Sequence, residues 1–525
     1  MQSTSSLHDN KELIRRIASG TISGSICSFV RVATRLITIP VVIAHVGLDG
    51  YGIWAIIMAV TSYMRLGIGG VRSAFQKYVA ESTGEAGAEQ TSRLLSTGSA
   101  ALLGLSLIGL APAAWFAGHL ARLSGVPNNF LSSASASLSL LALTLIIANA
   151  GSVYEAILMG AHRVDLVAKW DMFFACGEAA AIILLLRFGH GLYAMAAVMA
   201  TSEVIRVGCF FVLSRRILPA VHVTRKFLSA AVVPELLRFA ASYQVVGILE
   251  VAYQGLLPLA VLRCFGASAA GVFSVSTRLT WAALTVHQAL LLPLLSGAAH
   301  VHTSGTEEEL GRIVQKGIKA TLLLTLPVLV LLGVIGRDIV MAWTGRSDYA
   351  FGVVIWLTNA SGLFASFSIL GMVVYRATGG TWNDLLRQVV RIGTVVAAVV
   401  LARHWTFYVL LAGFVASELL GMMVMMSALR SRIRGMRVRV LISDTAKLVL
   451  ISAAVIALAE LLGRLPFLPG SAGRQAALFR IAVVSFSAVL MSWPALILIR
   501  FFTRSEEDKV SELFSHFHGR VGISR

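Results

Sequence analysis

Three arginines lie in stretches of the sequence whose other residues are mostly apolar or small. Arg31 and Arg35 fall in the stretch 17–46, and Arg278 falls in the stretch 269–299. An arginine at the centre of a bilayer costs roughly 2.5–3.5 kcal/mol to insert, so these side chains should face protein or water. A planar guanidinium holds two oxygens of one phosphate at once. We therefore interpret the three arginines as candidates for binding an anionic ligand.

The spacing of the first two arginines places them on one side of a helix. At 100° per residue, Arg31 and Arg35 are separated by about 40° around the axis. Small and polar residues fall near the same stripe, namely Gly24, Cys27, Ser28, Thr38 and His45. The stripe predicts one wall of a cationic cavity at membrane depth. The alternative is an internal salt bridge, with Glu250 or Glu203 as the partner of Arg31.

A carboxylate in the expected helix 235–263 is the second candidate. Glu250 shares its helix face with Tyr243 and Gln254, so we expect the three to line the same cavity. A carboxylate buried in a membrane can carry a proton, which makes Glu250 a candidate for ion coupling. Structural pairing is the alternative role, and it is the one we expect for the other acidic residues in apolar stretches.

Other residues in the apolar stretches have simpler interpretations. Pro40 and Pro258 are candidates for helix kinks that act in gating, or they are prolines that a membrane helix tolerates. Glu203 and Arg206 are one helical turn apart and predict an ion pair within one helix. The remaining arginines lie closer to the ends of their stretches, where long side chains can reach the interface; they are Arg65, Arg206, Arg238 and Arg391.

The composition is that of an all-α polytopic membrane protein. Of 525 residues, 57% are hydrophobic and only 13% are charged, and the mean hydropathy is +0.80, whereas soluble domains are about 25% charged. The net charge of +18 lies mostly in short loops, so it indicates membrane topology and no nucleic-acid partner. The four cysteines have no metal-ligand spacing. No nucleotide-binding or catalytic motif occurs, so we expect no metal, no cofactor and no enzymatic activity.

About fourteen transmembrane helices are expected, because that many stretches approach the length of about 20 residues that spans a bilayer. Lysines and arginines gather in alternate loops, which places both termini in the cytoplasm, and no cleaved signal peptide is evident. The expected organisation is an N-terminal six-helix bundle at 1–220, a cytoplasmic linker at 221–234, a C-terminal six-helix bundle at 235–435, two further transmembrane helices at 436–503, and a cytoplasmic tail at 504–525 that is a candidate amphipathic helix.

The two halves repeat the same landmarks at an offset near 218 residues. Pro40, Gly47 and the turn Asp49–Gly52 correspond to Pro258, Gly266 and the turn 269–273. Six helices per half is an even number, so the two bundles have the same orientation and an axis along the membrane normal relates them. Two such bundles with a ligand cavity between them are the architecture of a transporter, in which the cavity opens alternately to either side of the membrane.

Several motifs resemble the Wzx-type oligosaccharide flippases, the polysaccharide branch of the MOP (multidrug/oligosaccharidyl-lipid/polysaccharide) superfamily. They are VRVATRLITIPVVIAHVGLDGYGIWA, YMRLGIGGVRSAFQKYVAE, ILMGAHR, FGHGLYAM and VVYRATGG. The resemblance covers nearly the whole chain, and the N-terminal block is the most specific. It implies a V-shaped pair of six-helix bundles plus two C-terminal helices. It also implies a cationic cavity, to which Arg31, Arg35 and Arg278 match by placement.

The resemblance also implies an activity and its setting. The expected activity is translocation of undecaprenyl-pyrophosphate-linked oligosaccharide across the bacterial inner membrane for O-antigen, capsule or exopolysaccharide synthesis. The expected partners are this lipid-linked oligosaccharide, membrane lipid, a polysaccharide polymerase and a chain-length regulator, with the protein itself a monomer. Three alternatives stay open: a MATE-like exporter of small molecules, a membrane-embedded polysaccharide polymerase or ligase, and a scaffold that transports nothing.

Overall fold

The structure is a computed structural model, and it describes residues 2–64, 68–81, 84–304, 306–346, 349–377, 382–402, 406–432, 438–462 and 473–498. At some helical positions, including 2–22, 235–244 and 286–304, the description covers the backbone and not the side chain. Fourteen α-helices and two short 3-10 turns make up these ranges, and no strand occurs among the described residues. The predicted tail at 504–525 lies outside the described residues.

The first seven helices are α1 (Gln2–Met64), α2 (Ile68–Glu81), α3 (Gly84–Trp115), α4 (Ala117–Leu123), α5 (Asn128–Gly160), α6 (Val164–Arg187) and α7 (Leu192–Ile217). The 3-10 turns Arg225–Phe227 and Ala230–Val232 lead to α8 (Val233–Ser304), α9 (Glu307–Thr344), α10 (Tyr349–Ala377), α11 (Trp382–Ala402), α12 (Phe407–Arg432), α13 (Val438–Leu462) and α14 (Arg474–Leu498). Within the described ranges, nine helices are long and apolar enough to cross a membrane. The expected all-α, multi-pass membrane fold is confirmed.

Two of these helices are long enough for two crossings each. The apolar parts of α1 and α8 span 42 and 41 residues, about twice the length that crosses a bilayer. Gly47 interrupts α1 with φ 76° and ψ 173°, and Gly266 interrupts α8 with φ 86° and ψ −179°. Only glycine adopts such positive φ angles without strain. The interruptions fall at the glycines that the repeat matches, while the helix continues through Pro40 and Pro258.

The two matched segments, 49–52 and 269–273, are helical in the structure and pack against each other. A Cβ added at Gly52 would lie 2.2 Å from the carbonyl oxygen of Ala267, and one added at Gly271 would lie 2.5 Å from that of Leu48. Each glycine therefore lets the backbone of the other repeat approach to a distance that a side chain would forbid. This reciprocal contact between equivalent segments is the geometry that a rotational repeat produces, so it supports the internal repeat.

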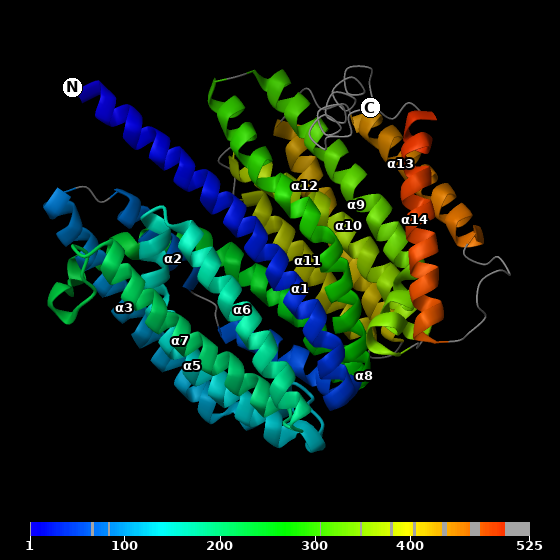
Figure 1. The fold of residues 1–525 in the computed structure, drawn as a ribbon, viewed down its shortest axis with the longest axis horizontal. Helices are drawn as coiled ribbons and strands as arrows, with labels where there is room; N and C mark the ends of the chain where they lie inside the picture. The colour runs from blue at the N-terminus through cyan, green and yellow to red at the C-terminus, as the bar shows by residue number, and fades with distance from the viewer. Residues whose placement is uncertain are drawn as a thin grey trace, which may run out of the picture. The chain divides into compact units, whose positions relative to one another are not determined.

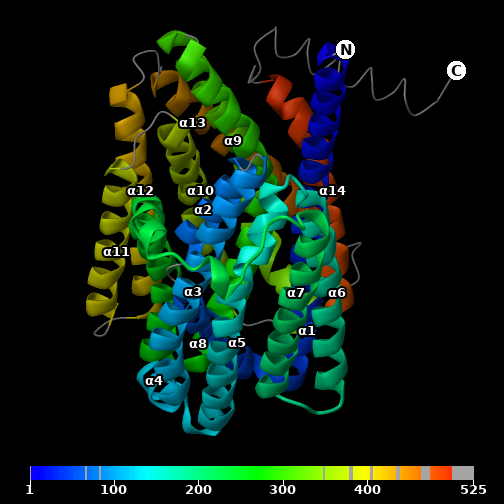
Figure 2. The ribbon, with the colours of Figure 1, turned by 90° about the vertical axis from the view of Figure 1, so that its left-hand side faces the viewer.

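The chain divides into two compact units, of which the first contains Met1–Val275 and Asp384–Ser417. Within it, α5 packs against α3 and α7 (Figure 1), and α6 packs against α1 and α7 (Figure 2). A hydrophobic core between α2, α3 and α5 contains Phe75, Leu95 and Val153. This packing fixes α1 beside α6, which sets the surroundings of the two N-terminal arginines.

The second unit contains Ser276–Asn383 and Glu418–Arg525. Here α9 packs against α10, α13 and α14 around a core that includes Ile318 and Leu322. Thr280 of α8 donates a hydrogen bond of 2.7 Å to Asn359 of α10, whose amide donates one of 2.9 Å to the carbonyl of Leu329. The two six-helix bundles predicted to end at 220 and 435 stay a prediction.

Candidate functional site

Arg31 lies on the side of α1 that packs along α6. Its Nη1 is 4.0 Å from the Oδ2 of Asp171, and its side chain is 49% exposed whereas that of Asp171 is 17% exposed. An ion pair at this distance is long compared with the 2.7–2.9 Å of a strong charge-assisted hydrogen bond. Arg31 is therefore oriented by a carboxylate, while half of its side chain stays accessible to a ligand.

Behind this pair, Arg206 of α7 is surrounded by carboxylates. It donates to Glu203 at 2.7 Å, to Glu155 of α5 at 3.3 Å and to Asp171 of α6 at 3.5 Å. The predicted pair between Glu203 and Arg206 is confirmed. Because Asp171 presents one oxygen to Arg206 and the other to Arg31, a chain of alternating charges runs from the interior of the first unit to the exposed guanidinium.

The two other predicted arginines have different surroundings. Arg35 is exposed on α1, one turn after Arg31, and it contributes to the electrostatic surroundings of Glu178 on α6. Arg278 belongs to the second unit and is also exposed. It takes part in none of the ion pairs found between described residues. All three arginines thus present accessible cationic groups, two of them on one helix.

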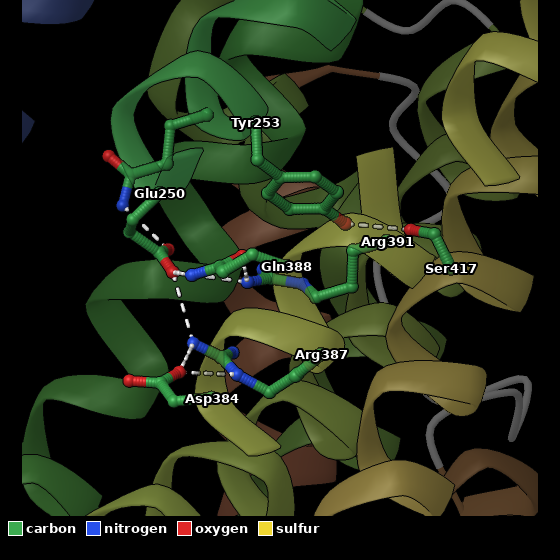
Figure 3. A network of polar contacts seen from close by, with 8 residues as sticks. Glu250, Tyr253, Asp384, Arg387, Gln388, Arg391 and Ser417 are labelled. Carbon is green, nitrogen blue, oxygen red and sulfur yellow. Dashed lines mark hydrogen bonds and ion pairs between the residues drawn. The ribbon is translucent and has the colours of Figure 1, made fainter. Parts of the chain in front are cut away.

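Glu250 is the centre of a second polar network in the first unit (Figure 3). Its Oε2 accepts hydrogen bonds from Nη2 of Arg387 at 3.2 Å and from Nη1 of Arg391 at 3.1 Å, and a short one from the amide of Gln388. Its Oε1 accepts one from Gln254 at 3.1 Å. Glu250 and Gln254 thus contact each other within α8, and Glu250 joins α8 to α11 through ion pairs; the cavity that they were expected to line stays a prediction.

The two arginines of this network are almost completely buried. Arg387 is 2% exposed and Arg391 is 4% exposed. Both Nε and Nη2 of Arg387 donate to Oδ1 of Asp384, one turn away, and the guanidinium of Arg391 lies 3.7 Å from the ring centroid of Tyr253. The expectation that Arg391 extends to the interface was wrong, because Glu250 and Tyr253 on α8 hold it inside the protein.

The other candidates have weaker geometric support. The side chain of Tyr243 lies outside the described residues. Pro40 and Pro258 are half-buried within continuous helix, so their role in gating stays a prediction. Within the described part of the chain, no group of three His, Cys, Asp or Glu residues could hold a metal ion.

A cavity of about 570 Å³ lies in the first unit between α1, α3, α4, α5 and α8. Apolar side chains such as Val60, Leu102 and Leu259 form most of its lining. Asn149 and Ser106, also in the lining, satisfy each other with a hydrogen bond of 2.9 Å. None of the three candidate arginines lines this cavity, so it suits an apolar group and not an anion.

Solved structures share this fold over most of their length. A MurJ lipid II flippase in an inward closed conformation matches with a TM-score of 0.71 and 13% identity, over 91% of this chain and 99% of its own. An inward-facing multidrug resistance MATE family transporter of the MOP superfamily gives 0.65 and 15%, over 77% and 94%. A MOP superfamily transporter from Pyrococcus furiosus, described as having a binding pocket of reversed polarity, gives 0.59 and 16%, over 80% and 95%.

These likenesses define the class of protein, which is a multi-pass membrane protein with the MOP-superfamily fold. The family follows from the sequence: the model of the family described as "Polysaccharide biosynthesis protein" matches residues 46–347. That is more than half of the chain, and the chain belongs to this family. No curated protein matches the chain. The family model thus confirms the expected polysaccharide family, and the solved structures confirm the expected fold.

Proposed function

We propose that this protein moves undecaprenyl-pyrophosphate-linked oligosaccharide repeat units from the inner to the outer leaflet of the bacterial inner membrane. Membership of a polysaccharide biosynthesis family and a fold shared with a lipid II flippase support a flippase or transporter in this process. The family and the fold neighbours are transporters and flippases, not enzymes. The products that use such repeat units are O-antigen, capsule or exopolysaccharide.

The single observation that carries the proposal is the accessibility of Arg31 in a stretch of α1 whose residues are mostly apolar or small. A half-exposed guanidinium at membrane depth is costly in lipid, but it is favourable if it meets an anion that crosses the membrane with it. A pyrophosphate offers several oxygens in the geometry that a planar guanidinium binds. The long contact with Asp171, 4.0 Å, orients Arg31 without occupying all of its donors.

Arg35 and Arg278 are assigned to the same role, because both are exposed cations in membrane-spanning helices. In this mechanism the arginines bind the pyrophosphate, polar residues meet the sugars, and the polyprenyl chain stays in lipid. Alternating access then exposes the bound headgroup to one leaflet and afterwards to the other. The proposed setting is the inner membrane with both termini in the cytoplasm. The protein acts there as a monomer, alongside a polymerase and a chain-length regulator.

The test uses purified protein in liposomes that contain undecaprenyl-pyrophosphate-linked oligosaccharide with a fluorescent sugar. Flipping is measured as the rate at which the sugar becomes accessible to a membrane-impermeant quencher. Arg31→Ala and Arg278→Ala should each lower this rate about tenfold or more, because a charge-assisted hydrogen bond contributes about 1.5–3 kcal/mol. Arg31→Lys should recover part of the rate, since it keeps the charge and loses the planar fork.

Arg93→Ala is the matched control, because this arginine is also exposed but pairs with Glu89 of its own helix at 2.7 Å. Protein with this substitution should flip the lipid-linked sugar at the wild-type rate. Wild-type rates for both Arg31→Ala and Arg278→Ala, at equal protein incorporation, would refute the role of the arginines. Export of cationic dyes by wild-type protein, with no flipping of the lipid-linked sugar, would instead establish a MATE-like small-molecule exporter.

A further inference from the structure

The carboxylate of Glu250 is bound in the way that a site binds a ligand anion. Three donors from consecutive turns of α11 meet at one atom, the Oε2 of Glu250, namely Arg387, Gln388 and Arg391. The other oxygen receives only one hydrogen bond between described side chains, from Gln254. Figure 3 shows the donors arranged side by side along α11, facing the carboxylate that α8 supplies.

We propose that Arg387, Gln388 and Arg391 form an anion-binding site that Glu250 fills in this conformation. An anionic oxygen group of the transported molecule, either a phosphate or a sugar carboxylate, occupies the site when the Glu250 side chain moves away. The site is additional to Arg31, Arg35 and Arg278. This proposal rests on the proposed function in one respect, namely that the transported molecule carries a phosphate or a sugar carboxylate.

The donors are held in place without Glu250. Arg387 pairs with Asp384 inside α11 through two contacts of 3.0 and 3.1 Å to one oxygen. Arg391 donates to the Oε1 of Gln388 at 2.8 Å and packs against the ring of Tyr253 at 3.7 Å. These contacts join residues other than Glu250, so the donor geometry persists when its carboxylate leaves. A site prepared in this way pays little ordering entropy on binding.

The exposure of the side chains shows from which direction an anion can arrive. The side chains of Arg387 and Arg391 are 2% and 5% exposed, whereas that of Glu250 is 32% exposed. Glu250 is therefore the accessible member of each ion pair and the one that a rotamer change can remove. After this change the two buried guanidinium groups would lose the carboxylate that both of them contact, which is unfavourable. An incoming anion removes that cost.

The exchange also has a mechanical consequence. The ion pairs of Glu250 connect α8 to α11, and these residues are 137 and 141 positions apart in the sequence. A ligand that replaces Glu250 breaks this connection, so binding at the site and movement of α8 against α11 become coupled. The coupling requires only that the ligand bind the arginines better in the conformation that lacks the Glu250 contact.

The test measures binding of two small anions, inorganic pyrophosphate and glucuronate, to the purified full-length chain by calorimetry at fixed ionic strength. All variants carry Arg31→Ala, Arg35→Ala and Arg278→Ala, so that none of the arginines proposed for flipping contributes and the two proposals fail separately. Glu250→Gln should bind at least one of the anions about tenfold more tightly than the parent. Preferential binding of pyrophosphate identifies a phosphate ligand, and preferential binding of glucuronate identifies an acidic sugar.

Two controls make the result specific. Adding Arg391→Gln to Glu250→Gln should abolish the gain, while Glu89→Gln, which removes an exposed carboxylate elsewhere, should produce none. If Glu250→Gln does not fold, Glu250→Asp keeps the charge but withdraws it by one methylene, and a smaller gain is expected. The proposal is overturned if neither Glu250 variant binds either anion more tightly, if Glu89→Gln gives the same gain, or if the gain survives loss of Arg391.

Discussion

Two buried or half-buried arginines of the first unit, Arg206 and Arg387, are each matched by carboxylates from more than one place in the sequence. Arg206 forms ion pairs with Glu203 of its own helix, with Glu155 of α5 and with Asp171 of α6. A buried charge without a partner is far more costly than a missing contact between neutral groups. The three carboxylates and the arginine therefore depend on one another, and the arginine is the member that all three share.

This dependence predicts a large loss of stability for Arg206→Gln. The substitution removes the Arg206 cation from Glu155 and Asp171, which are 7% and 17% exposed, while Arg31 stays 4.0 Å from Asp171. We expect the free energy of unfolding to fall by about 3–5 kcal/mol, as for other broken buried ion pairs, and the unfolding temperature of the purified protein in detergent to fall with it. Arg93→Gln, which breaks an exposed pair, should cost about 1 kcal/mol or less. Equal unfolding temperatures for the two variants would contradict the argument.

Sequence reasoning finds such pairs only when they lie within one helix. Glu203 and Arg206 are 3 positions apart, so helical geometry alone predicts their contact. Asp171 is 35 positions from Arg206, and Glu250 is 141 positions from Arg391. Those contacts depend on which helices pack together, which hydrophobicity patterns do not specify. The sequence therefore identified Glu250 and Arg31 as unusual, while their partners Arg391 and Asp171 required the structure.

At the scale of helices, glycines determine where the long apolar segments turn and how closely they meet. The positions of the apolar helices and the repeat were predictable from hydropathy and from matched landmarks. The expected helices 17–46 and 235–263 end close to the breaks at Gly47 and Gly266. Pro40 and Pro258 were the candidates for kinks, because proline is the more familiar cause of a kink, yet the helix continues through both prolines. The glycine that the two repeats share, Gly47 in one and Gly266 in the other, was the available signal in the sequence.

The reciprocal glycine contact predicts that Gly52→Ala destabilises the protein. Its new methyl group would lie 2.2 Å from the backbone oxygen of Ala267, and backbone cannot move aside as a flexible side chain can. Overpacking of this kind costs about 1–3 kcal/mol, which should appear as a lower unfolding temperature and a lower flipping rate. Gly104→Ala is the matched control, since nothing lies within 4 Å of its added Cβ. Identical behaviour of the two variants would exclude a close approach at Gly52.

At the scale of the whole molecule, the distribution of charge is the strongest constraint. The net charge of +18 comes from lysines and arginines that the sequence predicts to gather in alternate loops. Positively charged loops remain on the cytoplasmic side of the membrane. An even number of crossings then returns the chain to the side on which it began. Hydropathy and charge together therefore predict an orientation, even though they do not specify which helices pack together.

Reporter insertions test this orientation. A green fluorescent protein fused to either terminus should fluoresce, because both termini are predicted to be cytoplasmic. Alkaline phosphatase inserted at Gly189, in the exposed turn between α6 and α7, should be active, because it folds only outside the cytoplasm. The matched insertion at His162, in the exposed turn between α5 and α6, should be inactive, since Arg163 and Lys169 keep this turn inside.

Active phosphatase at His162, or a terminus that does not fluoresce in a stable fusion, would require an odd number of crossings or the inverted topology. The inverted topology would also place the proposed loading of the lipid-linked sugar on the wrong side of the membrane.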